Sequence, residues 1–148
     1  MKLSGVSATA VNAAAAAAWS GHGGTATHAA RAPAAAQALN RVLWSTAIDL
    51  APPYTSGGFL LIHYGSPVIS AANVVMLPVK RNSAGAFRVE ARAGATGSVL
   101  WQQDTDYILP VSSWTPSMNL ALHGERIFIP AAGGRVLVRD QASSATGA

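Results

Sequence analysis

The 148-residue sequence contains no cysteine, which excludes disulfide bonds and thiolate metal sites. Charged residues make up only 11% of the chain, below the roughly 25% of an average globular domain. No apolar run reaches the ~18 residues that a membrane-spanning helix needs, so no transmembrane segment is expected. The formal charge is +4, but Lys80-Arg81 is the only adjacent basic pair. Nucleic-acid binders cluster their charge on one face, so we expect no nucleic-acid partner.

Residues 1–38 are rich in alanine, glycine, serine and threonine, which predicts a mostly irregular leader and linker. Three interpretations of the first 18 residues stay open: a weak secretory signal, a disordered leader or a short alanine-driven helix. Trp19 then heads a glycine-rich stretch that contains His22, and His28 follows it. A tryptophan in such a stretch often docks onto the body of a domain.

The sequence from residue 39 onward consists of short apolar runs separated by turn residues, which predicts an all-β fold of antiparallel strands. A β-rich run at 39–49 precedes a predicted loop at 51–58, because two prolines and two glycines do not suit a regular ladder. Residues 59–64 are either a short strand or an ordered loop. Further strands are predicted at residues 66–70, 73–80, 85–92, 98–102, 114–120, 125–130 and 134–140.

Two of these runs predict how their faces are covered. Residues 73–80 are almost continuously apolar, which favours a strand buried on both faces. In residues 85–92, Phe87 and Val89 alternate with Arg88 and Glu90. That alternation predicts one buried face and one solvated face.

The strand pattern repeats at an interval of about 50 residues. The matched positions are Pro78 and Pro130, 52 apart, Gly85 and Gly134, 49 apart, Gly97 and Gly147, 50 apart, and Trp44 and Trp101, 57 apart. A recurring four-stranded unit of this length is the signature of a β-propeller blade. We therefore expect residues 39–148 to form part of a propeller, with one blade at 65–103 and an incomplete blade at 114–148.

The order of these motifs resembles the pyrroloquinoline-quinone-like (PQQ-like) repeat, a family that groups with WD40-like propellers. That repeat runs through a Gly turn, a strand ending near Asp, a Thr-Gly turn and a strand that carries Trp. The motifs here are the runs at 73–79, 85–92 and 95–101 and the shorter copy at 134–147. The glycine-rich stretch after residue 19 resembles the segment that follows the signal peptide in secreted propellers of this kind, which implies a secreted or periplasmic location.

The resemblance also implies roles for single residues. The family's tryptophan docks between neighbouring blades, which implies that role for Trp44 and Trp101. The equivalent turn glycines are Gly97 and Gly147. Asp140 holds the place of the family's Asp, whereas the first copy departs from the pattern at that place.

The family includes quinoprotein dehydrogenases as well as non-catalytic scaffolds, and a fold does not decide between them. The first hypothesis is a non-catalytic binding or scaffold segment of a secreted or periplasmic PQQ-like propeller. Its partners are the remaining blades and a protein or carbohydrate ligand. The alternative is the N-terminal fragment of a PQQ-dependent quinoprotein dehydrogenase, whose PQQ and calcium site lies in blades outside this segment. In both cases we expect no catalytic residue and no cofactor in this segment.

Three residues are candidates for a binding rim at the mouth of a propeller channel. His63, Tyr64 and Trp114 precede the predicted first strands of successive blades. An aromatic and histidine rim suits sugars, peptides or a flat cofactor, and ordinary loop packing is the alternative interpretation.

The sequence predicts no metal site. Asp104 and Asp106 are the only close acidic pair, and they are either part of a calcium loop or a turn between blades. None of the histidines falls at zinc-ligand spacing, and the last two are expected in loops. The histidines are His22, His28, His63 and His123.

Overall fold

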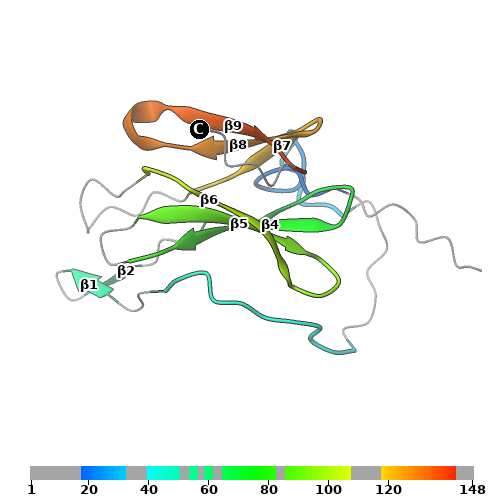
Figure 1. Ribbon diagram of the computed structural model, residues 1–148, viewed down its shortest axis with the longest axis horizontal. Helices are drawn as coiled ribbons and strands as arrows, with labels where there is room; N and C mark the ends of the chain where they lie inside the picture. Colours follow the sequence, from blue (N-terminus) through cyan, green and yellow to red (C-terminus); the bar gives the residue numbers. More distant parts are fainter. Residues whose placement is uncertain are drawn as a thin grey trace, which may run out of the picture.

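The computed structural model describes residues 18–32, 40–50, 54–56, 59–61, 65–82, 86–107 and 118–142. In these ranges the chain forms antiparallel β-sheets and one short 3₁₀ turn, so the prediction of an all-β protein is confirmed. A four-stranded sheet lies in the middle, with a three-stranded sheet on one side and the extended residues 40–50 on the other (Figure 1). Among the described residues, no helix has the length and apolarity to cross a membrane.

The middle sheet is a meander in which strand order follows chain order. Its strands are β3 (Val68–Ile69), β4 (Val74–Lys80), β5 (Phe87–Ala93) and β6 (Val99–Asp104). A short turn joins β3 to β4, and the turn after β5 ends at Gly97, whose φ of +73° favours glycine. The four predicted strands are confirmed, with ends within two residues of those expected.

The second sheet contains β7 (Ala121–His123), β8 (Arg126–Pro130) and β9 (Val136–Asp140), with the 3₁₀ turn η1 (Ala132–Gly134) between the last two. Its first strand was expected at 114–120, but residues 118–120 are outside any strand. The placement of His123 in a loop was also wrong. A two-residue turn pairs His123 with Arg126, and Gly124 in this turn has a φ of +56°. This tight hairpin sets the position of β7.

A third, small sheet pairs β1 (Tyr54–Ser56) with β2 (Phe59–Leu61). The prediction of a loop over 51–58 was therefore wrong for Tyr54–Ser56. The prolines precede the strand, and tyrosine and threonine favour strand conformation once a partner is two residues away. The open choice for 59–64 is settled in favour of a strand at Phe59–Leu61.

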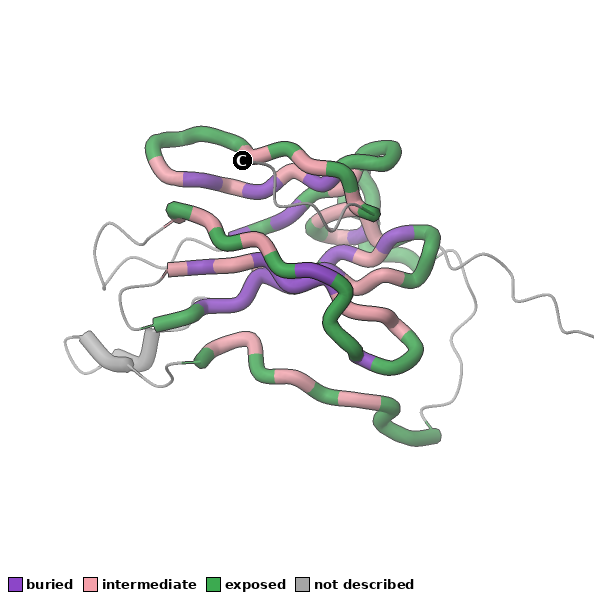
Figure 2. Tube along the Cα trace, viewed as in Figure 1, coloured by how far each residue is buried: buried purple, intermediate pink, exposed green. Residues whose placement is uncertain are grey.

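The apolar core lies between the two larger sheets (Figure 2). Alternate residues of the middle sheet point into it, and the second sheet and the chain before β7 supply the other side. Such burial of aliphatic and aromatic side chains contributes roughly 1.5–3 kcal/mol for each residue. The buried members are Val68, Met76, Phe87, Val89, Ala91, Trp101, Met118, Leu120, Ile127 and Ile129.

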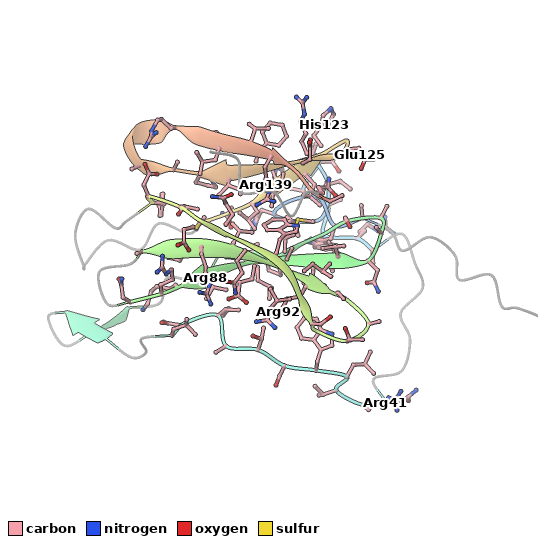
Figure 3. All side chains as sticks on the ribbon, in the orientation of Figure 1. Arg41, Arg88, Arg92, His123, Glu125 and Arg139 are labelled. Atoms are coloured by element: carbon pink, nitrogen blue, oxygen red, sulfur yellow. The ribbon has the colours of Figure 1, made fainter. Side chains whose placement is uncertain are left out.

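The opposite face of the middle sheet carries charges but is covered. Arg88 and Arg92 lie on the side that faces residues 40–50 (Figure 3). Glu90 between them is only 2% exposed, so the expectation of a solvated face was wrong. Both arginines donate to Glu90, which lets a carboxylate remain inside the structure. The prediction that β4 is covered on both faces is confirmed, since Met76 and Val79 on opposite faces are fully buried.

Residues 40–50 form an extended segment. In the described part of the chain, its backbone pairs with a strand at one position only. Asp49 forms a parallel bridge with Lys80 of β4. The backbone N–H of Lys80 donates to the Ile48 carbonyl, and the N–H of Leu50 donates to the Lys80 carbonyl, both at 2.9 Å. The Lys80 Nζ atom, which is fully buried, lies 2.9 Å from the Asp49 carboxylate. The predicted β-rich run is thus extended but mostly outside a ladder.

Candidate functional site

Trp44 joins the extended segment to the turn after β5. Its indole Nε1 donates a 2.8 Å hydrogen bond to the carbonyl oxygen of Gly94. The ring lies against Gly97, where an added Cβ would come within 2.7 Å of indole carbons. Gly97 is needed twice here, for its positive φ and for this close approach.

Trp101 makes the corresponding contact one sheet further along. It lies on β6, and its indole Nε1 donates a 2.7 Å hydrogen bond to the carbonyl oxygen of Gln141, just beyond β9. The Arg139 guanidinium lies 4.0 Å from the centre of the Trp101 ring and donates to the Gln103 side chain. Burial lowers the pKa of Arg139, which remains charged because an arginine titrates far above neutral pH. Gly147 lies outside the described residues.

The two tryptophan contacts give an alignment of the second sheet with the middle sheet. Gly94 is the first residue after β5 and Gln141 is the first residue after β9, which are 47 residues apart. The cross-strand pairs agree with this shift, because Pro78 faces Val89 and Pro130 faces Val136. Gly85, which was matched with Gly134 at an interval of 49, lies outside the described residues, so that match stays a prediction.

Residues 18–32 connect the first strands of the two sheets. The backbone of Trp19 exchanges hydrogen bonds with Ile69 of β3 at 2.8 and 2.9 Å. The next residue, Ser20, accepts a 2.7 Å bond from the N–H of Leu122 in β7. The expectation that Trp19 docks onto the body of the domain is confirmed. The irregular segment thereby ties the free edges of β3 and β7 together.

A hollow of about 310 Å³ lies beside this connecting segment, lined in part by His22, His28 and Asn119. The Nδ1 atom of His28 donates a 2.6 Å bond to the carbonyl oxygen of His22, and the two rings are 6.0 Å apart. The Asn119 side chain accepts a 3.1 Å bond from the N–H of Ser66. Histidine and amide groups at a concave edge can bind a polar ligand.

A second hollow, of about 280 Å³, lies on the same edge. His123 and Glu125 of the β7–β8 hairpin line it together with Ser70 and Gln141. Figure 3 shows His123 and Glu125 close together at the end of the second sheet. Sequence reasoning missed these residues as a group because a three-residue strand and a two-residue turn bring them together. The glycine after His123 was the one available signal of that turn.

The residues predicted to form a channel rim, His63, Tyr64 and Trp114, lie outside the described residues. Gly65 is described and packs closely, since an added Cβ would lie 1.8 Å from the carbonyl oxygen of Met118. The chain that leads into the middle sheet therefore contacts the chain that leads into the second sheet. Of the predicted docking residues, Trp44 and Gly97 are brought together, and Trp101 contacts a different part of the fold.

The acidic pair forms contacts between neighbouring elements. Asp104 lies 3.0 Å from Arg81. Asp106 accepts a 3.0 Å bond from the N–H of Ala132 and forms an ion pair with Arg135, both in or beside η1 of the second sheet. The Ala132 N–H, aided by the Arg135 charge, lowers the pKa of Asp106. Within the described ranges, no group of three or more His, Cys, Asp or Glu side chains is placed to hold a metal ion.

Fold and site together define an all-β protein in which two antiparallel meanders stack face to face and tryptophans join successive layers. Comparison with known proteins gives no identification beyond this class, because no family model, no curated protein and no solved structure matches the chain.

Proposed function

We propose that this chain is a non-catalytic binding or scaffold segment of a secreted or periplasmic β-propeller protein of PQQ-like type. In this proposal the middle sheet is one four-stranded blade, and the second sheet is the first three strands of the next blade. Residues 40–50 are the outer strand of a preceding blade. The remaining blades and a protein or carbohydrate ligand are its partners.

One repeated contact carries the proposal. Trp44 and Trp101 each donate an indole N–H to the carbonyl just beyond the third strand of the following sheet. A propeller places each blade face to face with its neighbour and repeats the same contacts from blade to blade. Layers that were not structurally equivalent would not be expected to repeat this indole-to-carbonyl hydrogen bond.

The binding role is supported by the inner edge of the two sheets. The connecting segment, the turn after β3 and β7 line two hollows with histidine, asparagine and other polar groups. In a propeller, the first strands of the blades line the central channel, where ligands bind. The mixture of polar groups and short side chains suits hydroxyl or amide partners more than an apolar ligand.

Matched tryptophan variants test the blade part of the proposal. Trp44→Phe and Trp101→Phe each remove one indole N–H and leave a carbonyl without its donor. Each is expected to lower the free energy of unfolding by about 1–3 kcal/mol, and by similar amounts. Urea unfolding measures both. A large loss for one variant and none for the other would contradict the equivalence of the two contacts.

An NMR titration of the ¹⁵N-labelled chain tests the binding part. We expect oligosaccharides or short peptides to shift the amide signals of His22, Asn119 and Leu122, and PQQ with calcium to leave them unchanged. Asn119→Ala should weaken the response, whereas Val42→Ser, at the far side of the middle sheet, should not. Shifts produced by PQQ with calcium would contradict both the proposed function and the dehydrogenase alternative, because each places PQQ and calcium outside this segment.

A further inference from the structure

The outer edge of β9 has unused backbone hydrogen-bonding groups within the described part of the chain. Hydrogen bonds from Ala131 N–H to Arg135 and from Gln141 N–H to Glu125 flank the β8–β9 ladder. Antiparallel ladders alternate, so the N–H groups of Val136 and Val138 point away from β8. Among the described residues, no strand pairs with this edge.

The same edge is occupied in the middle sheet. With the 47-residue shift set by the tryptophans, Val136 and Val138 correspond to Val89 and Ala91. Val89 faces Gln103 and Ala91 faces Trp101, both on β6. The second sheet therefore repeats the first three strands of the middle sheet and presents the edge on which a fourth strand lies there.

The chain also contains an extended segment that matches a fourth strand. Residues 42–44 repeat residues 99–101, and Trp44 makes the contact that Trp101 makes one sheet later. From Trp44 to Ala47 the burial alternates between half-buried and exposed, as in a strand with one covered face. Val42 and Leu43 are 81% and 64% exposed, and residues 42–47 belong to no ladder.

One copy of the chain cannot join these two features. Residues 40–50 and β9 lie on opposite sides of the middle sheet, which separates them completely (Figure 1). When a strand and a matching sheet edge lie at opposite ends of a molecule, they can pair only with those of another molecule. Exposed apolar residues at both places, Val136 at 58% and Val138 at 50% beside Val42 and Leu43, favour such pairing.

We propose that copies of this chain associate head to tail, with residues 42–47 of one copy pairing antiparallel with β9 of the next. The proposal rests on the blade equivalence of the proposed function, and it puts further copies of this chain in the place of the remaining blades. The donated strand completes a four-stranded sheet by β-augmentation. Trp44 of the copy that donates the strand keeps its hydrogen bond to Gly94 of the same copy. Because the donated strand then belongs to the second sheet of the neighbouring copy, this hydrogen bond connects that sheet to the middle sheet of the donating copy.

The repeat fixes the register of this pairing. Transferring the β5–β6 pairs places Val138 opposite Trp44 of the next copy and Val136 opposite its Thr46. Val136 is exposed and Thr46 is half-buried, and both lie outside the core. Directly opposite residues of a hydrogen-bonded pair have Cα atoms about 5.5 Å apart, which a disulfide can span.

The absence of cysteine makes a cross-linking experiment direct. Single variants Thr46→Cys and Val136→Cys of the full chain are mixed and oxidised. The proposal expects a disulfide-linked pair that contains one molecule of each variant, in excess of either variant linked to itself. A mixture of Thr46→Cys with His123→Cys is the control, because His123 lies on β7 at the other edge of the same sheet. Equal cross-linking in both mixtures would overturn the proposal.

A backbone variant tests the edge without cysteine. Val138→Pro removes an outward N–H and leaves the β8–β9 ladder intact, whereas Val138→Thr keeps the N–H. Analytical ultracentrifugation of the unmodified chain should show a mass that rises with concentration. Val138→Pro should need at least about tenfold more protein for the same degree of association, and Val138→Thr should resemble the unmodified chain. A single-chain mass at every concentration, with circular dichroism showing a folded protein, would overturn the proposal.

These outcomes are separable from those of the proposed function. The Trp44→Phe and Trp101→Phe comparison is carried out in the Val138→Pro background, where the chain is expected to be monomeric. Equal losses there with no self-association in the unmodified chain would reject the head-to-tail pairing and leave the blade equivalence standing. Unequal losses would reject both.

Discussion

The indole ring of Trp44 occupies the space that a side chain on Gly97 would need. A Cβ on Gly97 would lie 2.7 Å from two ring carbons of Trp44, and Gly97 also has a φ of +73°. The two residues are 53 positions apart and belong to different layers. Their contact ties the extended segment to the middle sheet.

Gly97→Ala should therefore destabilise the protein for two separate reasons. The positive φ costs about 1–2 kcal/mol for alanine, and displacement of the indole adds about 1–3 kcal/mol. Gly124→Ala is the matched control, because Gly124 has a φ of +56° but no atom within 4 Å of the new Cβ. Gly124→Ala should show only the cost of the positive φ. Urea unfolding compares the two, and equal losses would show that the Trp44 contact does not stabilise the fold.

The strands of the middle sheet were predictable because their local signals agree. β-branched and apolar residues alternate or run continuously in 74–80 and 87–93, and Gly97 marks a turn. These strands depend on residues close in sequence. The repeat and the family resemblance singled out Trp44 as a docking residue and Gly97 as a turn glycine, but they did not predict the contact between the two.

Other parts of the fold depend on long-range contacts that no local pattern reveals. Glu90 alternates with apolar residues, a pattern typical of a solvated side chain. The face of the middle sheet that carries Glu90 is nevertheless covered by residues 40–50. The hollows at the inner edge form only where residues near 20, 70 and 120 meet.

Removing the buried charge of β5 should be costly. Glu90 accepts from Arg88 Nε at 2.8 Å and from Arg92 Nε at 3.0 Å, and its side chain is 3% exposed. Glu90→Gln leaves two arginines without their counter-charge, so we expect a loss of about 3–5 kcal/mol in the free energy of unfolding. Glu125→Gln, in the exposed β7–β8 turn, should change stability by about 0.5 kcal/mol or less. Comparable losses in the two variants would contradict the role of the network.

Acid should weaken the link between the middle sheet and η1. The Ala132 N–H and Arg135 hold the pKa of Asp106 below its ordinary value of 3.8. The folded state thus binds this proton less readily than the unfolded chain, and stability falls as pH decreases below about 3.8, through the lowered pKa of the folded state. Asp106→Asn removes this titration. Stability measured from pH 2 to 6 should fall less steeply in the variant, and identical slopes would contradict the assignment.

The buried pair of Lys80 and Asp49 should be sensitive to the loss of one partner and tolerant of the loss of both. Lys80 is fully buried and the Asp49 side chain is 8% exposed, with 2.9 Å between nitrogen and oxygen. Asp49→Leu leaves the ammonium group without this carboxylate, and we expect a loss of about 3–5 kcal/mol. The double variant with Lys80→Met replaces both charges by apolar groups, so it should recover most of that loss. A double-mutant cycle by urea unfolding measures the recovery. If the double variant is as unstable as Asp49→Leu, the cost arises from the shape of the new side chain and not from the loss of the Asp49 charge.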